Sequence, residues 1–134
     1  MSQGIDVIME PLIKAMNSIP YIETFSCCEG HPEESAVKNY GYAVANVVFE
    51  IKDEPQYLIS WLFLVQEILR GRKNVRKGFA FIFEKKYSLN IDNGLSWNWE
   101  VKIQATGETP EVCRKGLDEG IEYLTEKFLN DSKR

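Results

Sequence analysis

Apolar residues recur along this chain at two spacings, one typical of helices and the other typical of strands. A helical stripe opens the sequence, at Ile5, Ile8, Met9, Leu12 and Met16. Pro11 predicts that the regular helix begins near Glu10 or is kinked there. Pro20 should end this helix, and the aromatic and β-branched run 21–27 predicts a first strand.

The middle of the chain predicts a second strand and a strongly apolar helix. Residues 42–51 are apolar on one side, and Val44 and Val48 on the other side indicate a central strand. Asp53 can cap the next helix, with Pro55 in its first turn and Gly71 at its end. The predicted inner face of this helix is Leu58, Leu62, Val65 and Leu69. Because Trp61, Phe63 and Leu64 add apolar bulk around it, we expect it to be the most buried of the helices.

The last part of the chain predicts two strands and a closing helix. Phe79 to Phe83 is apolar on both faces, whereas Trp97 to Ala105 alternates cleanly and places Trp97 and Trp99 in the core. Asn93 and Gly94 supply turn residues before this strand. Thr109 and Pro110 mark the start of the helix. Its predicted inner face is Cys113, Leu117, Ile121, Leu124 and Phe128.

The fold class that follows is α+β, in a single domain over residues 1–134. The element order, helix-strand-strand-helix-strand-strand-helix, predicts a mostly antiparallel four-stranded sheet with the three helices mainly on one face. The other face would then expose Val44, Val48, Ala80 and Ile82 unless something covers them. A homodimer joined through this open sheet face is one way to cover them.

The composition of the chain indicates its cellular environment but does not indicate a reaction. The net charge of -4 argues against a protein that is basic overall. Three cysteines, an odd number, and an N-terminus without a signal-like stretch predict a reducing, cytoplasmic location. The longest apolar run, residues 57–65, is far shorter than the roughly 20 residues that span a bilayer, so no membrane span is expected.

The run SCCEGHP, residues 26–32, contains the closest grouping of potentially reactive side chains in the sequence. A sharp turn at Gly30 would aim Cys28 and His31 at one point and expose backbone N–H groups to an anion. His31 is the only histidine, and when protonated it would lower the pKa of the Cys28 thiol. The predicted catalytic residues are Cys28, Glu29 and His31, and the predicted ligand-binding residues are Ser26, Cys27 and Gly30.

The same run also fits a structural turn, with Cys27 facing the core as a small hydrophobe. Zinc fits it poorly, because Cys28 and His31 have a liganding spacing but lack a full set of partners. No metal is therefore expected, and the sequence contains neither a dinucleotide-binding glycine motif nor a phosphate-binding loop.

The run resembles a motif of the tRNA wybutosine-synthesizing methyltransferase family, in which a strand ends in Ser-Cys-x-Gly-Arg. The matching residues are Ser26, Cys27 or Cys28, Glu29, Gly30 and His31, after a strand that contains Thr24. His31 stands where the family has arginine, and the second cysteine adds a residue to the motif. The resemblance implies S-adenosylmethionine as cofactor and a tRNA substrate.

A basic segment follows the apolar helix. Five cations, Arg70, Arg72, Lys73, Arg76 and Lys77, lie within eight residues that contain no acid. Residues 70–77, and Arg72, Lys73, Arg76 and Lys77 in particular, are the predicted RNA contact, since phosphate contacts supply most nonspecific affinity. Cations at a helix C-terminus also oppose the helix dipole, which is the structural alternative.

Two classes of function remain open from the sequence. One is a ligand-binding or methyltransferase-like enzyme with its site at residues 26–31 and RNA on the basic segment. The other is a noncatalytic homodimeric interaction or structural module in which residues 26–31 are only a turn. Substitution of Cys28 and His31 should separate these classes, because only the first requires their side chains for ligand binding.

Overall fold

The computed structural model of the chain describes residues 7–28, 42–71, 79–92 and 94–133. Within these residues the chain forms a four-stranded sheet and three α-helices, in the order expected from the sequence. The strands are β1 (Ile22–Cys28), β2 (Tyr42–Ile51), β3 (Phe79–Asn90) and β4 (Gly94–Thr106). The helices are α1 (Glu10–Asn17), α3 (Pro55–Gly71) and α4 (Pro110–Ser132), with a 3-10 turn, η1 (Val7–Met9), before α1.

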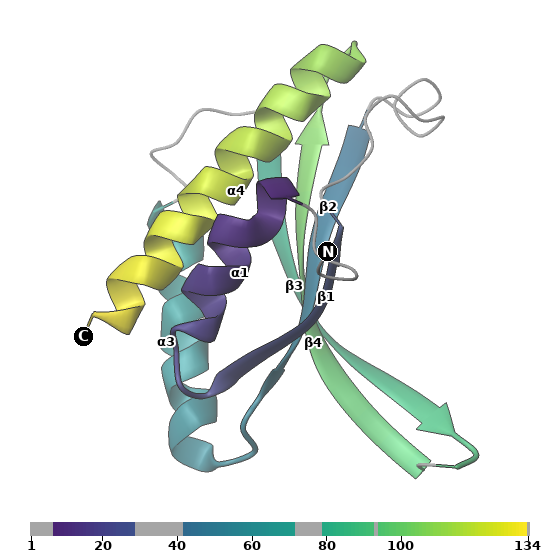
Figure 1. The fold of residues 1–134 in the computed structure, drawn as a ribbon, viewed down its shortest axis with the longest axis vertical. Coiled ribbons are helices and arrows are strands. Elements are labelled where there is room, and N and C mark those ends of the chain that lie inside the picture. The colour runs from purple at the N-terminus through teal and green to yellow at the C-terminus, as the bar shows by residue number, and fades with distance from the viewer. Residues whose placement is uncertain (1–6, 29–41, 72–78, 93, 134) are drawn as a thin grey trace.

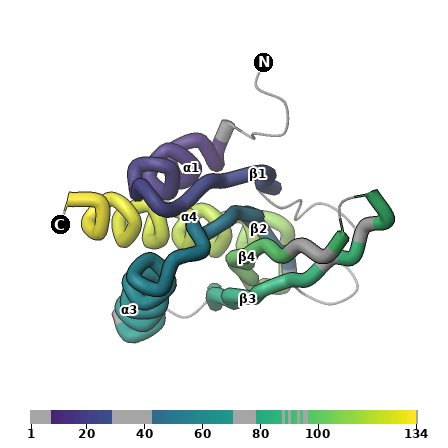
Figure 2. The backbone as a smooth tube through the Cα atoms, turned by 90° about the horizontal axis from the view of Figure 1, so that it is seen from below, coloured from purple at the N-terminus to yellow at the C-terminus, as the bar shows by residue number. Residues whose placement is uncertain are grey.

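The sheet has the strand order β1-β2-β4-β3, and every neighbouring pair is antiparallel. The helices lie on one side of it, as Figure 1 shows, so the predicted α+β class and its one-sided helix layer are confirmed. Helix α1 packs mainly against α4 and β1, while α4 lies along the central strands. Figure 2 shows α3 standing beside this layer, at some distance from α1.

Several turn and cap residues set the element boundaries as the sequence predicted, but Glu54, whose carbonyl accepts the Leu58 N–H, precedes α3 in place of the predicted cap Asp53. The Thr109 hydroxyl accepts a hydrogen bond from the Val112 backbone N–H at 3.2 Å, which satisfies one of the unpaired donors at the start of α4. Pro11 lies in the first turn of α1, where its missing N–H costs nothing. Gly94 has a φ of 73°, the left-handed conformation that the turn between β3 and β4 requires.

One face of the sheet and the inner faces of the helices form a continuous core. The predicted inner face of the last helix is confirmed, since all five of its residues are buried in α4. The sheet contributes alternate residues, as the period of a strand requires. These sheet residues include Ala43, Ala45, Val47, Phe49, Ile51, Phe79, Phe81, Val101, Ile103 and Ala105.

The hairpin of β3 and β4 is longer than the sequence predicted. Strand β3 continues seven residues past Phe83, and β4 begins three residues before Trp97. Figure 1 shows this hairpin extending well beyond the helices. Trp99 packs against the core, but Trp97 pairs with Tyr87 beyond the helix layer and is partly exposed. The prediction that Trp97 is a core residue was wrong for this reason.

Gly120 lets α4 approach the sheet closely. A Cβ atom at this position would lie 2.6 Å from Ile103 Cγ2 and 3.4 Å from Phe79 Cδ2. The first distance is shorter than a carbon-carbon contact allows, so a larger residue would push the helix away from β4. Close packing therefore accounts for a glycine in the middle of a helix, where it otherwise costs about 1 kcal/mol relative to alanine.

We predict that Gly120→Ala lowers the free energy of unfolding by about 1–2 kcal/mol, because the overpacking at Ile103 outweighs the gain in helix propensity. Urea denaturation measures this change. In an Ile103→Ala background, which removes the clashing methyl group, the same substitution should instead stabilise the protein. Equal effects in the two backgrounds would contradict the close-packing explanation.

Candidate functional site

The described part of the predicted SCCEGH site ends at Cys28, the last residue of β1. Glu29, Gly30 and His31 lie outside the described residues, so the predicted convergence of Cys28 and His31 stays a prediction. Ser26, Cys27 and Cys28 all lie in β1, where their neighbours on β2 are known. The structure therefore shows which way each of the two thiol-bearing residues faces.

A β-bulge between Thr24 and Ser26 determines the orientation of the two cysteines. Thr24 pairs with Phe49, but Ser26 pairs with Val48, so Phe25 is the extra residue. After the bulge, Cys27 pairs with Val47 and packs against the core. Cys27 therefore faces the core, as the structural alternative expects, and its predicted part in ligand binding stays a prediction.

Helix α1 holds the start of this bulge in place. The side-chain carbonyl of Asn17, the last residue of α1, accepts a hydrogen bond from the Thr24 backbone N–H at 3.1 Å. The Asn17 amide also donates to the Thr24 hydroxyl at 2.9 Å. These bonds use the edge of β1 immediately before Phe25, so the bulge is anchored to the helix layer.

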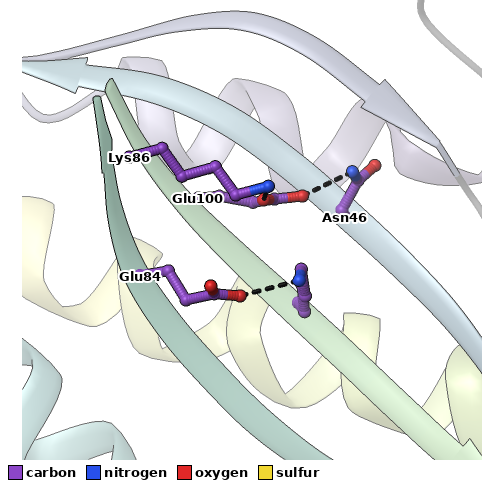
Figure 3. A network of polar contacts seen from close by, with 5 residues as sticks. Asn46, Glu84, Lys86 and Glu100 are labelled. Carbon is purple, nitrogen blue, oxygen red and sulfur yellow. Dashed lines mark hydrogen bonds and ion pairs between the residues drawn. The ribbon is translucent and has the colours of Figure 1, made fainter. Parts of the chain in front are cut away.

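Cys28 and Ser26 lie on the opposite, open face of the sheet, next to a polar cluster. The neighbour of Cys28 on β2 is Asn46, whose side-chain amide donates a hydrogen bond to Glu100 Oε2 at 2.7 Å. Glu100 Oε1 lies 2.6 Å from Lys86 Nζ. Figure 3 shows these three side chains crossing from β2 over β4 to β3.

A second ion pair joins β3 and β4 on the same face of the sheet. Lys102 Nζ lies 2.7 Å from Glu84 Oε1, so two acids and two lysines alternate across β3 and β4. Glu100 is only 3% exposed and is the one charged residue that is buried in the described part of the chain. The sequence gives only a weak signal for its role, a glutamate between Trp99 and Val101 in a central strand.

The contacts of Glu100 keep it ionised. Burial raises the pKa of its carboxyl, but hydrogen bonds from Lys86 and Asn46 and the charges of Lys86 and Lys102 outweigh burial and lower the pKa below its ordinary value. The hydrogen bond to Glu84 raises the pKa of the Lys102 ammonium. With both oxygens engaged, Glu100 is suited to holding three strands together and not to donating a proton near neutral pH.

No described residues form a group of three or more histidine, cysteine or acidic side chains that could hold a metal ion. In the same ranges, no helix is both long enough and apolar enough to cross a membrane.

Of the basic segment, Arg70 is described and is exposed in the last turn of α3. Arg72, Lys73, Arg76 and Lys77 lie outside the described residues, so the RNA contact stays a prediction.

Helix α3 faces the core mainly with residues other than those predicted, and of the predicted inner face only Val65 packs against the core. Trp61, Leu64 and Ile68 are buried, whereas Leu58, Leu62 and Leu69 of the predicted inner face are exposed. The prediction was wrong because large apolar side chains cover most of the circumference of the helix, apart from a polar strip at Gln56, Ser60 and Glu67, and periodicity alone then cannot choose between the apolar faces. The expectation that this helix would be the most buried was also wrong.

The outer face of α3 is the largest group of exposed apolar side chains on one described element. We define it as five residues that are between 39% and 66% exposed: Leu58, Ile59, Leu62, Phe63 and Leu69. At 100° per residue they occupy an arc on the opposite side of the helix from Trp61, Leu64 and Ile68. Soluble monomers rarely leave a contiguous apolar face of this kind uncovered.

The projecting hairpin carries a second apolar surface. Tyr87, Leu89 and Trp97 continue the core side of the sheet past the helices and are exposed. Lys85 Nζ lies 5.1 Å from the centre of the Trp97 ring, a cation-π distance that partly shields the indole. This surface has three such residues, against five on the outer face of α3, and is interrupted by the lysine.

No family model, curated protein or solved structure significantly matches this chain. Function has to be argued from the described geometry.

We predict that Glu100→Gln lowers the free energy of unfolding by about 1–3 kcal/mol at neutral pH, toward the lower end because Lys86 is half exposed. A lowered pKa in the folded state means that the charge stabilises the protein above the unfolded pKa, which for a glutamate is near 4.5. The difference between the variant and the original protein should therefore disappear as the pH falls through the folded pKa, below that value.

Urea titrations over a range of pH measure this difference, and Glu126→Gln, at an exposed position of α4, controls for the loss of a surface charge. A Glu100→Gln effect that does not change with pH would contradict the role given to the carboxylate.

Proposed function

We propose that this chain is a noncatalytic interaction module that works as a homodimer joined through the outer face of α3. The observation that supports the proposal is the exposure of the five large apolar side chains of that face. A wide apolar stripe on a helix is normally packed against other elements across its whole width. Among the described residues of one copy, only the side of α3 that bears Trp61, Leu64 and Ile68 is buried, and a second copy would cover the outer face.

The open face of the sheet is less suited to this role. Of the apolar residues there, Val44 and Val48 are already half-buried, and Ala80 and Ile82 are exposed near the Glu84 and Lys102 ion pair. Covering that ion pair would remove its charges from water, and the desolvation free energy is unfavourable unless new partners compensate for it. The outer face of α3 carries no such charge between Leu58 and Phe63.

The chemistry of the described residues also favours a binding role over catalysis. Catalytic acids and bases commonly combine burial with a pKa shifted toward neutrality. Glu100 is buried, but its partners shift its pKa the other way and engage both of its oxygens. The methyltransferase-like reading depends on Glu29 and His31, so it stays a prediction. A rise in thermal midpoint with S-adenosylmethionine would favour that reading over the present proposal.

We predict that the protein sediments as a dimer at tens of micromolar concentration and that Phe63→Asp makes it a monomer. Phe63 is 66% exposed in one copy, so an aspartate there should leave the fold intact but would be desolvated in the dimer. The dissociation constant should rise at least about a hundredfold. Sedimentation velocity measures the change in mass.

Phe25→Asp is the matched control. Phe25 is 54% exposed but lies on β1, away from α3, so this variant should remain a dimer. A protein that is monomeric before any substitution, or a Phe63→Asp variant that still dimerises fully, would refute the proposal.

A further inference from the structure

We infer that the projecting hairpin carries a binding site for a quaternary ammonium group, walled by the rings of Tyr87, Trp97 and Trp99, and that the side chain of Lys85 occupies this site in the structure. We name the three rings the aromatic cage. The inference goes beyond the proposed homodimer and does not depend on it, because none of these residues belongs to the outer face of α3.

The three rings of the aromatic cage converge on one cation. Lys85 Nζ lies 5.1 Å from the centre of the Trp97 ring, 5.9 Å from that of Tyr87 and 5.9 Å from that of Trp99. Each distance is within the roughly 6 Å over which the face of an aromatic ring attracts a cation. Several rings around one point are also the arrangement with which proteins recognise quaternary ammonium ligands and methylated lysine. The Lys85 ammonium therefore marks the position that a ligand cation would take.

The pairing of β3 with β4 brings these side chains together. Lys85 is opposite Trp99, and Tyr87 is opposite Trp97, two positions further along each strand, so all four side chains lie on one face of the hairpin. The Tyr87 and Trp97 rings meet edge to face, with their centres 6.2 Å apart and their planes at 60°. Trp99 packs against the core, which makes it the best fixed of the three walls. The register of the hairpin alone thus assembles the aromatic cage.

The aromatic cage is accessible from solvent. The hairpin extends beyond the helices in Figure 1, and Tyr87 is 64% exposed and Trp97 38% exposed. Burial in the core of one copy therefore does not explain why large rings stand at these two positions. Exposed apolar side chains that lie together are typical of interaction sites.

Lys85 is a weak occupant of the aromatic cage. Its primary ammonium is compact and strongly hydrated, and the residue is exposed, so water competes with the rings for its charge. A trimethylammonium group carries the same charge on methyl groups, which contact the rings and donate no hydrogen bonds to water. Because the stem of Lys85 is flexible, such a ligand can displace its ammonium without moving either strand.

We predict that tetramethylammonium chloride shifts the indole N–H resonances of Trp97 and Trp99 saturably in an NMR titration of the full chain at constant ionic strength. The buried Trp61 should respond less. Lys85→Thr should tighten binding about two- to fivefold, because it removes the internal competitor. Trp97→Ala should weaken binding at least about tenfold, read from the Trp99 resonance.

Two controls separate the charge of the probe from its size and from the charge of the protein. Neopentyl alcohol has nearly the shape of tetramethylammonium but no charge, so it should bind at least about tenfold more weakly. Lys115→Thr is the same substitution at an exposed position of α4, and it should leave the affinity unchanged.

The source of the quaternary ammonium group is tested with two further probes. Choline represents a small molecule, and a short peptide that contains trimethyllysine represents a modified protein. The tighter of the two identifies the source. The same peptide with unmodified lysine should bind at least about tenfold more weakly than the methylated one, because its ammonium remains strongly hydrated.

Three outcomes would overturn the inference. They are the lack of a saturable shift in both the original protein and Lys85→Thr, equal binding of neopentyl alcohol, and weaker binding after Lys85→Thr. If Trp97→Ala disrupts the hairpin, seen as a loss of nuclear Overhauser effects between β3 and β4, then Tyr87→Leu provides the test, since it removes one ring but keeps an apolar side chain. Unchanged binding by a folded Tyr87→Leu variant would likewise contradict the aromatic cage. The Phe63→Asp variant should bind the probe as the original protein does, so failure of the homodimer and failure of this site are distinguishable.

Discussion

The attachment of α3 depends on the burial of one side chain, Trp61. Its ring is fully buried and lies 5.1 Å from the ring of Phe49, 5.7 Å from Phe83 and from Trp99, and 6.3 Å from Phe128, measured between ring centres. Through these contacts a single indole joins α3 to β2, β3, β4 and α4. Large buried aromatic residues dominate the energy of such contacts, because each removes 150–250 Å² from water.

Two further contacts fix the ends of α3 without covering its outer face. The Tyr57 ring stacks on the Tyr21 ring at 5.4 Å near the start of the helix. Burial, followed by the charge of Asp131, raises the pKa of Tyr21 to about 12, so this ring stays neutral. Near the other end, the Tyr123 hydroxyl of α4 donates a hydrogen bond to the Ile68 carbonyl at 2.9 Å. The helix is thus held from one side along its length, and its remaining apolar surface is left for a partner.

The sequence was a good guide where one physical signal acted alone. The alternation of β4 from Val101 to Ala105, the Thr109 cap of α4 and the inner face of α4 each followed from a single pattern, and each is confirmed. The inward-facing side of α3 could not be predicted, because Trp61 and Leu62 are both large and apolar, and only the shape of the pocket among Phe49, Phe83 and Trp99 distinguishes them. Of the candidate site, the residues in β1 could be placed, whereas Glu29, Gly30, His31 and the basic segment after Arg70 lie outside the described residues.

The bulge at Phe25 makes two chemically identical neighbours unequal. Without the extra residue the pairing of β1 would continue in phase, and Cys27 would lie opposite Asn46 while Cys28 turned toward the helices. Loss of a single residue at this point would therefore exchange the surroundings of the two sulfur atoms while leaving Cys27 and Cys28 themselves unaltered. The path of the backbone therefore determines the different environments of the two cysteines, and any difference in their reactivity would result from it.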